Sequence, residues 1–488
     1  MIRYLKKFDL PIVMLFFVLA VILRFFSFFP SVIDHDESTY LVIGNELTKG
    51  KILYHDITDI KPVGIFYIIA GFFKLFGKTI FGFRILGAFA ISLTSYFLYL
   101  IKIEMGHPKK VAVASGIIYI LFTSIWTLYG VSPNTEHFFN LTIAIALFFV
   151  FWKQNNTGRY IGAFVFGIGF LIKIVVLFDF IALLLFLIYI DWINKVQFSR
   201  MIKVYSTMGI IFLIPFGLVS CAYGFTGYFR EFFHVNFIVF KNYPVDKSFL
   251  KLLVWLLEFF SRFLPITFFL FYALFSKCNP KTVKTNERLF VVIWMVFGLI
   301  SITMPGKISR HYLIQLMLPI SLYASNIFHP EMPIPRFLNL LFQPKIGYTL
   351  LGLLLVLNVS LQWNDFYKKP DPPKLIAADI RAVLKKGEVV YTGNAYQIIY
   401  FLLDVSPPTK YVHSSLLFKS SHYKALEIDP TAELVKIFKS KPRFIIEKNS
   451  SKKQLIPPAF RLQYRIKKYY PEFDVTLYEL KTTSSSLE

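Results

Sequence analysis

Three acidic residues near the start of the chain are the first candidates for chemistry. Asp34, Asp36 and Glu37 follow the apolar segment 10–30 almost directly. A carboxylate in this position could act as a general base for an attacking hydroxyl or amine, or bind a divalent cation. The alternative is structural, because an acidic residue often caps a helix, here one expected over residues 37–48. For Asp36 considered alone, the cap is the more common role.

A further acid, Glu136, lies in the polar segment 132–137, immediately before another apolar run. Two carboxylates could divide the acid and base roles or share a metal ion, so Asp36 and Glu136 are the candidate ligands for a divalent cation. The dipole of the following helix explains an acidic residue at this place equally well. The metal question stays open at this point. The chain has no nucleotide-binding loop, HExxH, GxSxG or zinc-type cysteine motif.

Several residues could hold a phosphate at the membrane surface. Lys173 interrupts the apolar run 161–190. Placing a charge inside a bilayer costs at least about 2.5–3.5 kcal/mol on insertion scales, so a charged side chain in a membrane span is interpreted first as a functional residue. Arg310 opens another apolar segment, and a helix N-terminus favours an anion. The structural alternatives are headgroup anchors and, for Lys173, a turn of the chain. The candidate set is Lys61, Lys173, Arg310, His311 and Tyr312.

Other charges in apolar surroundings are explained without a substrate. Asp179 could pair with Lys173, six residues before it. Glu258 and Arg262 are four residues apart, so they could pair on one helix face. We interpret both pairs as structural.

The amino-acid composition indicates the class of protein to which these residues belong. Of 488 residues, 56% are hydrophobic and only 17% are charged, which excludes a typical soluble domain and a disordered chain. Two cysteines exclude a disulfide scaffold. The net charge of +24 is spread over loops and the C-terminal part rather than over one compact domain, so no nucleic-acid partner is expected. A multi-span membrane protein remains.

The apolar segments predict an α-helical polytopic protein with about eleven transmembrane helices. Basic residues gather in alternate loops, whereas the loop 131–137 has none, so the N-terminus is expected in the cytoplasm and the C-terminus outside. Segments 160–172 and 175–190 could instead form one long span, which would invert the orientation of everything after them. The predicted spans are 10–30, 81–101, 111–130, 138–152, 160–172, 175–190, 204–224, 251–275, 289–304, 312–328 and 346–362.

Two domains are predicted. Residues 1–362 form the membrane module, whose first outer loop, 31–80, includes an interfacial helix over 65–76. Residues 363–488 form a small α/β domain outside the membrane. In that domain, helices are expected at 375–386, 397–403, 432–441 and 460–470, and strands at 388–392, 410–413, 443–447 and 474–480.

A set of short motifs follows the first apolar segment in a fixed order. The motifs are Asp36-Glu37-x-x-Tyr40, Gly50-Lys51-Ile52-Leu53-Tyr54-His55-Asp56, Lys61-Pro62, Leu75-Phe76-Gly77, Arg84, Glu136, Gly167-Ile168-Gly169-Phe170-Leu171-Ile172-Lys173 and Arg310-His311-Tyr312-Leu313-Ile314-Gln315-Leu316-Met317-Leu318-Pro319. Each motif alone is weak, whereas the ordered set is fairly specific. In this order they resemble the GT-C membrane glycosyltransferases, in particular the branch that holds aminoarabinose transferases and protein O-mannosyltransferases. The likeness covers about residues 10–330.

The resemblance implies an inverting transfer of a hexose or pentose from a polyprenyl monophosphate to a lipid, glycan or protein acceptor, on the outer face of the cytoplasmic membrane. Asp36 would be the acid/base residue, with Glu37 beside it and Glu136 as the second acid of the cavity. Lys61 would contact the donor phosphate. Around the phosphate or sugar would lie Lys173, Arg310, His311 and Tyr312, with Asp34, Tyr40, Tyr54 and Arg84 as additional candidates.

The sequence departs from the aminoarabinose transferases at three positions. Thr39 stands where they have Arg, Ile60 where they have Glu before the lysine, and Val63 where a second proline is common. These departures argue against lipid A as the acceptor. They leave the phosphate-binding residues in place.

Two other classes of protein would explain part of the pattern. A transporter or flippase of a lipid-linked sugar also needs cations in the membrane, but it should show paired halves or broken helices in matching positions, and none is found. A non-catalytic partner in cell-surface glycan assembly could retain the fold without the reaction. The large loop 31–80 and the α/β domain favour an enzyme over a transporter, whereas only the activity of an Asp36→Ala variant would separate an enzyme from a non-catalytic partner.

Overall fold

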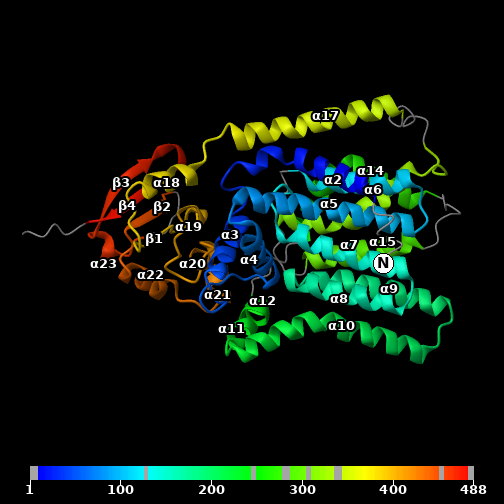
Figure 1. The fold of residues 1–488 in the computed structure, drawn as a ribbon, viewed down its shortest axis with the longest axis horizontal. Helices are drawn as coiled ribbons and strands as arrows, with labels where there is room; N and C mark the ends of the chain where they lie inside the picture. Colours follow the sequence, from blue (N-terminus) through cyan, green and yellow to red (C-terminus); the bar gives the residue numbers. More distant parts are fainter. Residues whose placement is uncertain are drawn as a thin grey trace, which may run out of the picture. The chain divides into compact units, whose positions relative to one another are not determined.

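The computed structural model describes residues 9–125, 130–242, 249–276, 286–303, 309–334, 343–449 and 455–481. The chain divides into two compact units (Figure 1). The first, here called the helical unit, comprises residues 1–29, 83–222 and 245–368. The second, the mixed unit, comprises residues 30–82, 223–244 and 369–488. The division into domains at residue 362 remains a prediction.

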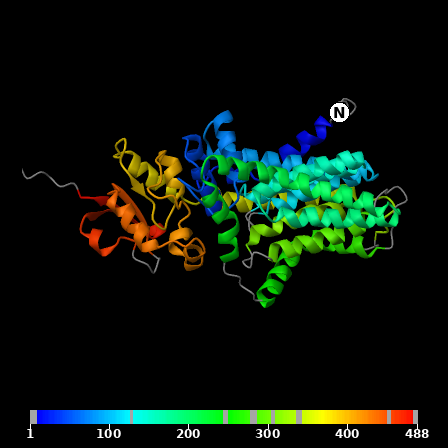
Figure 2. The same ribbon diagram turned by 90° about the horizontal axis from the view of Figure 1, so that it is seen from below.

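Each apolar segment that the sequence predicts as a span contains helix. Within the helical unit, α7, α8, α9 and α15 lie side by side in both views (Figure 1 and Figure 2). The helices are α2 (Leu10–Ile22), α5 (Ile80–Glu104), α6 (Lys109–Thr123), α7 (Thr135–Lys153), α8 (Asn156–Ile172), α9 (Val176–Ile193), α10 (Phe198–Phe225), α13 (Phe249–Arg262), α14 (Leu264–Phe275), α15 (Glu287–Thr303), α16 (Met317–Ala324) and α17 (Pro344–Gln362), with the 3-10 helices η1 (Phe25–Phe28), η4 (Arg310–Leu316) and η5 (Ser325–Phe328) and the π-helix η7 (Trp363–Tyr367).

The chain is a multi-span membrane protein. Among the described residues, five helices are long and apolar enough to cross a bilayer, or six if one bent pair counts as a single span. The predicted number of about eleven therefore remains a prediction. The five are Ile80–Glu104, Thr135–Lys153, Val176–Ile193, Phe198–Phe225 and Lys345–Arg381.

Two segments show how local sequence breaks a long apolar run. The backbone of Lys173 is extended, with φ −155° and ψ 129°, so 160–190 forms two helices, α8 and α9, rather than one. The predicted single span 251–275 is bent by 98° between α13 and α14. A proline at the start of α14 contributes to this break, because it lacks the backbone N–H that a continuous helix requires.

The mixed unit contains a four-stranded sheet in the order β1-β2-β4-β3. Strand β1 pairs with β2 in parallel, and the other neighbours are antiparallel. Its elements are α3 (His35–Thr48), α4 (Gly64–Phe76), α11 (Phe229–Phe233), the π-helix η3 (His234–Ile238), α12 (Val239–Asn242), α18 (Pro372–Arg381), β1 (Val390–Tyr391), α19 (Ile398–Leu403), α20 (Ser415–Phe418), α21 (Ser420–Ala425), α22 (Pro430–Lys439), β2 (Phe444–Lys448), α23 (Pro458–Arg461), β3 (Tyr464–Tyr470), the 3-10 helix η8 (Pro471–Phe473) and β4 (Val475–Leu480).

The helix predicted over 460–470 is wrong. Only Pro458–Arg461 is helical there, and Tyr464–Tyr470 forms the edge strand β3. Pairing with β4 decides the structure of this segment, and exposed lysines suit an edge strand. The strand predicted at 410–413 is reduced to a single bridge, between Tyr411 and Thr58.

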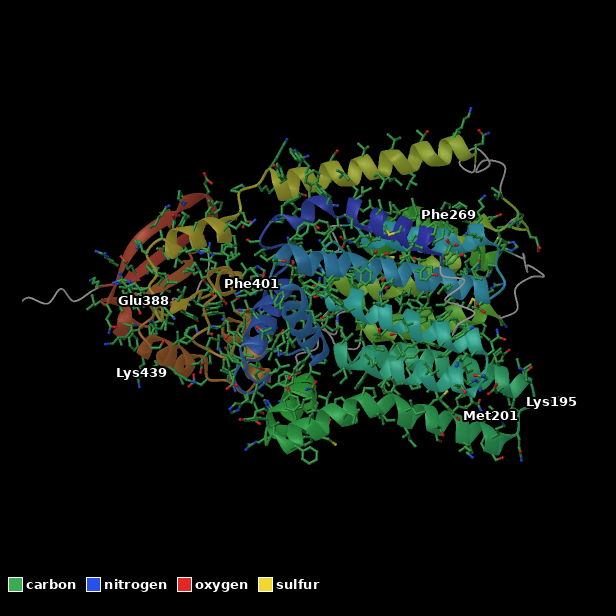
Figure 3. The ribbon with its side chains drawn as sticks, in the orientation of Figure 1. Lys195, Met201, Phe269, Glu388, Phe401 and Lys439 are labelled. Carbon is green, nitrogen blue, oxygen red and sulfur yellow. The ribbon has the colours of Figure 1, made fainter. Side chains whose placement is uncertain are left out.

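Residues far apart in the sequence meet inside the mixed unit. Helix α3 packs on α4, where Gly44 lets the backbone approach Ile69, since an added Cβ would lie 2.5 Å from the Ile69 side chain. Helix α19 packs on α3 in turn. Phe401 of α19, labelled in Figure 3, lies with its ring centroid 5.6 Å from that of Phe73 in α4. The C-terminal residues thereby pack against the helices of the loop 31–80.

Candidate active site

Asp34, rather than Asp36, caps helix α3. Its backbone is extended and its carboxylate accepts a hydrogen bond from the Asp36 backbone N–H at 3.1 Å. Asp36 is in the first helical turn, where the dipole favours a negative charge. Helix capping therefore explains Asp34 and does not explain the side chain of Asp36.

Asp36 lies in a cluster of charged and aromatic groups, here called the Asp36 cluster. The Lys61 ammonium lies 3.1 Å from Asp36 Oδ1 and 3.4 Å from Asp59 Oδ2. It also lies 5.0 Å from the ring centroid of Tyr40. The Asp36 and Lys61 side chains are 21% and 20% exposed, whereas that of Asp59 is buried. Two carboxylates thus share one ammonium at a position that solvent reaches. The cluster is Asp36, Tyr40, Asp59, Lys61 and His413.

The loop that presents Lys61 is fixed by its own hydrogen bonds. The Tyr54 hydroxyl donates to the Lys61 carbonyl oxygen at 2.7 Å, and Tyr54 is buried with a φ of 70°. The Thr58 N–H donates to the Lys410 carbonyl oxygen at 2.8 Å. Tyr54 therefore positions Lys61 through the backbone. Glu37, the neighbour of Asp36, is buried within α3.

The structure gives the contacts at two of the positions where the sequence departs from the aminoarabinose transferases. Asp59, one residue before Ile60, supplies a carboxylate to Lys61. Thr39 is buried, and its hydroxyl accepts a hydrogen bond from the Gln397 amide nitrogen at 3.1 Å.

Glu136 belongs to a second group, here called the Glu136 cluster. Its carboxylate is completely buried, forms an ion pair with Lys173, and accepts a hydrogen bond from the Thr135 hydroxyl at 3.1 Å. The Lys173 ammonium lies 3.8 Å from the ring centroid of Tyr312. His311 meets Tyr312 edge-on, with a centroid distance of 4.8 Å. The cluster is Glu136, Lys173, His311 and Tyr312, all named from the sequence.

The remaining candidates have other partners. An Arg310 guanidinium nitrogen lies 3.3 Å from a Glu258 carboxylate oxygen. The predicted partner of Glu258, Arg262, has a side chain outside the described part of the structure. Arg84 is buried and donates to the Ser27 carbonyl oxygen at 2.6 Å, which ties α5 to η1.

The predicted pair of Asp179 with Lys173 is wrong. The Asp179 carboxylate accepts hydrogen bonds of 2.6 Å from the Trp294 indole and from the Gln315 amide. Lys173 pairs with Glu136 instead. The break between α8 and α9 separates Lys173 from Asp179 along the helix, so a spacing of six residues did not bring them together.

The two clusters belong to different units, so the predicted pairing of Asp36 with Glu136 stays a prediction. Among the described residues, no three His, Cys, Asp or Glu side chains are placed together to hold a metal ion. Two members of the Asp36 cluster were missed in the sequence. Asp59 could have been found from its position two residues before Lys61. His413 had no such signal, because its contact arises only when the chain folds back.

The comparisons with known proteins agree with the sequence. A family model described as dolichyl-phosphate-mannose-protein mannosyltransferase matches residues 60–218. The chain is 24% identical over 368 residues to an undecaprenyl phosphate-alpha-4-amino-4-deoxy-L-arabinose arabinosyl transferase 1 from Pseudomonas fluorescens. That alignment covers 69% of this chain and 63% of the relative, so the chain spans less than two thirds of that protein.

Solved structures match over a greater length. ArnT from Cupriavidus metallidurans bound to undecaprenyl phosphate aligns with a TM-score of 0.66 at 14% identity, over 98% of this chain and 99% of that chain. The apo form aligns with a TM-score of 0.64 at 14% identity, over 96% and 97%. Together these matches confirm the resemblance to GT-C membrane glycosyltransferases of the aminoarabinose transferase and protein mannosyltransferase type.

Proposed function

We propose that this chain, a membrane protein of the GT-C glycosyltransferase type, transfers a sugar from a polyprenyl monophosphate to an acceptor outside the cytoplasm. The observation that carries the proposal is the Asp36 cluster. A partly exposed carboxylate is held by a lysine directly after the first apolar helix, and Asp34 supplies the helix cap separately. This arrangement suits a general base at the membrane surface.

In the proposed reaction, an acceptor hydroxyl or amine attacks the anomeric carbon of the sugar. A bond forms between the acceptor atom and that carbon, while the bond from the carbon to the phosphate oxygen breaks. Asp36 takes the acceptor proton, and the lipid phosphate leaves with one more negative charge than it had in the donor. Attack opposite the leaving group inverts the anomeric configuration.

Cationic groups would stabilise the departing phosphate as its charge grows. We assign this role to Lys61, Lys173 and Arg310, with His311 and Tyr312 beside them. Glu136 would hold Lys173 extended, because its buried carboxylate and Thr135 fix one end of the pair. Tyr54 and Tyr40 would position Lys61. Asp36 and Glu136 would be the ligands of a divalent cation if the reaction uses one.

The membrane arrangement belongs to the same proposal. About eleven helices would cross the bilayer. The N-terminus would lie in the cytoplasm, and the loop 31–80 and the sheet of the mixed unit would lie outside. The exposed apolar residues Tyr67, Leu75 and Phe76 of α4 would contact the lipid headgroup region. A lipid, glycan or protein acceptor would then approach from the outer side.

The test is transfer from a panel of radiolabelled polyprenyl-phosphate sugars by the purified protein in nanodiscs, with membrane extract as the source of acceptors. Donor consumption that depends on Asp36 supports the proposal and identifies the sugar. No consumption by the wild type across the panel, together with unchanged behaviour of Asp36→Ala, would move the function to transport or to a non-catalytic role.

A further inference from the structure

His413, from the C-terminal part of the mixed unit, faces the proposed base. Its Nε2 lies 3.6 Å from Asp36 Oδ1, and its side chain is 18% exposed. The charged and titratable groups around it are Asp36, Asp59, Lys61 and His35. The ring centroids of His413 and His35 are 6.5 Å apart. The distance to Asp36 is slightly longer than a hydrogen bond, and catalytic contacts of this kind often tighten only when substrate binds.

The hydrogen bonds of the ring decide which nitrogen carries its proton. The backbone N–H of Ser415 donates to His413 Nδ1 at 3.1 Å. A backbone N–H can only donate, so Nδ1 uses its lone pair there and the neutral ring carries its hydrogen on Nε2. Nε2 is the atom that faces Asp36. His413 is therefore arranged to donate towards the carboxylate.

The backbone on both sides fixes the ring. Tyr411 forms a β-bridge with Thr58, in the loop that presents Lys61. After the ring, the Ser415 hydroxyl lies 2.8 Å from His413 Nδ1 and 2.8 Å from Nδ1 of His422. His413 therefore has a defined position with respect to Lys61 and Asp36, although it is far from both in the sequence.

We propose that His413 is a positioning residue for Asp36: its Nε2–H and the Lys61 ammonium hold the same carboxylate oxygen, Oδ1, and orient the base towards the acceptor. This role rests on the proposed function. It makes the C-terminal part of the chain a contributor to the reaction.

The neutral ring is required for this role. Burial lowers the pKa of His413, although the nearby Asp36 and Asp59 carboxylates raise it in part.

The experiment compares His413→Gln with His413→Asn in the full-length protein in nanodiscs. The Gln amide nitrogen reaches as far as Nε2, whereas the Asn amide nitrogen ends near Nδ1. We expect His413→Asn to lower kcat by about 10- to 100-fold with little change in the KM for donor, the range for one hydrogen bond to a charged group. His413→Gln should recover most of the rate.

The control is His234→Asn, which removes another histidine–carboxylate contact of the mixed unit, to Glu427 at 3.5 Å, and should leave kcat unchanged. Equal loss in His413→Gln and His413→Asn would show a packing role and overturn the inference. Full activity of both variants, with an active wild type, would overturn it while leaving the proposed function intact. An inactive wild type would overturn both.

Discussion

The Asp36 cluster and the Glu136 cluster use the same types of residue in opposite environments. Asp36 is about one-fifth exposed and shares one lysine with a second carboxylate. Glu136 is completely buried and pairs with Lys173, beside the Tyr312 ring. A group that exchanges protons needs access, and a group that holds a fixed charge needs protection from water. Within the proposed function, this difference favours proton transfer by Asp36 and an electrostatic role for Glu136.

The two clusters are also held in place by different parts of the chain. Asp36 depends on residues from the first loop and from the C-terminal part, such as Lys61 and His413. Glu136 depends on elements of the helical unit, through Lys173 and Tyr312. Variants of the first cluster should therefore affect turnover more than stability. Variants of the second should affect both.

The largest effect is expected from Asp36→Asn, which removes the base and preserves the shape of the side chain. Turnover should fall by roughly 10²- to 10⁴-fold, the usual contribution of general acid–base catalysis. Donor binding should persist. The measurement is single-turnover transfer together with equilibrium binding of the donor. Asp34→Asn is the matched control, because asparagine also caps helices and should retain activity. An active Asp36→Asn protein would transfer the role of base to another residue.

The next effect concerns the stability of the buried pair. Glu136→Leu and Lys173→Met each leave one unpaired charge, and each should lower the unfolding free energy by about 3–5 kcal/mol. The double variant should regain most of that stability, because an apolar pair is tolerated in its place. Its turnover should stay low. Thermal unfolding of the four proteins in detergent gives the coupling. Additive losses would mean that the two side chains do not stabilise each other.

Lys61 tests whether the Asp36 cluster needs a point charge. Lys61→Gln should lower kcat/KM by about 10- to 100-fold, since a charged hydrogen bond is lost at both carboxylates. Lys51→Gln is the control, because Lys51 also pairs with a buried carboxylate, Glu46 at 2.6 Å, but at the other end of α3. Equal effects of the two variants on kcat/KM would show that Lys61 only stabilises the loop.

The sequence predicted much of this fold, because apolar runs and helix breakers act locally. Every predicted span contains helix, and the break at Lys173 separates the predicted segments 160–172 and 175–190. The predictions that failed concern structure that the local sequence does not decide. The strand at 464–470 exists because β4 pairs with it, which its lysines could not indicate. The bend between α13 and α14 interrupts a run that composition alone treats as continuous.

In the candidate site too, some residues were found from the local sequence and others are brought there only by folding. Glu136, Lys173 and Tyr312 were named from charge in apolar surroundings and from motifs, and they do meet. Asp36 and Lys61 also meet. His413 could not be found, because its position depends on a bridge between residues 58 and 411. Long-range pairing of this kind leaves no mark in a single sequence.

The smallest effect should come from Asp404, which joins the C-terminal part to the helix that carries Asp36. Its carboxylate lies 2.5 Å from Lys78, 3.1 Å from Lys49 and 3.2 Å from the Asn45 amide. Burial opposes ionisation, but these bonds outweigh it and lower the pKa of Asp404 to about 2. Asp404 has a φ of 58°, a conformation that asparagine also tolerates.

Because the folded pKa of Asp404 lies below the unfolded value of 3.8, the unfolded chain binds more protons between these values. The contribution of Asp404 is therefore complete above about pH 4 and is lost as the pH falls towards 2. Asp404→Asn should remove this part of the acid dependence and should cost at most about 1 kcal/mol at pH 7, since the side chain is 59% exposed. Unfolding temperatures across this pH range provide the measurement. A larger loss, accompanied by lower turnover, would show that the Asp36 cluster depends on this contact as strongly as on His413.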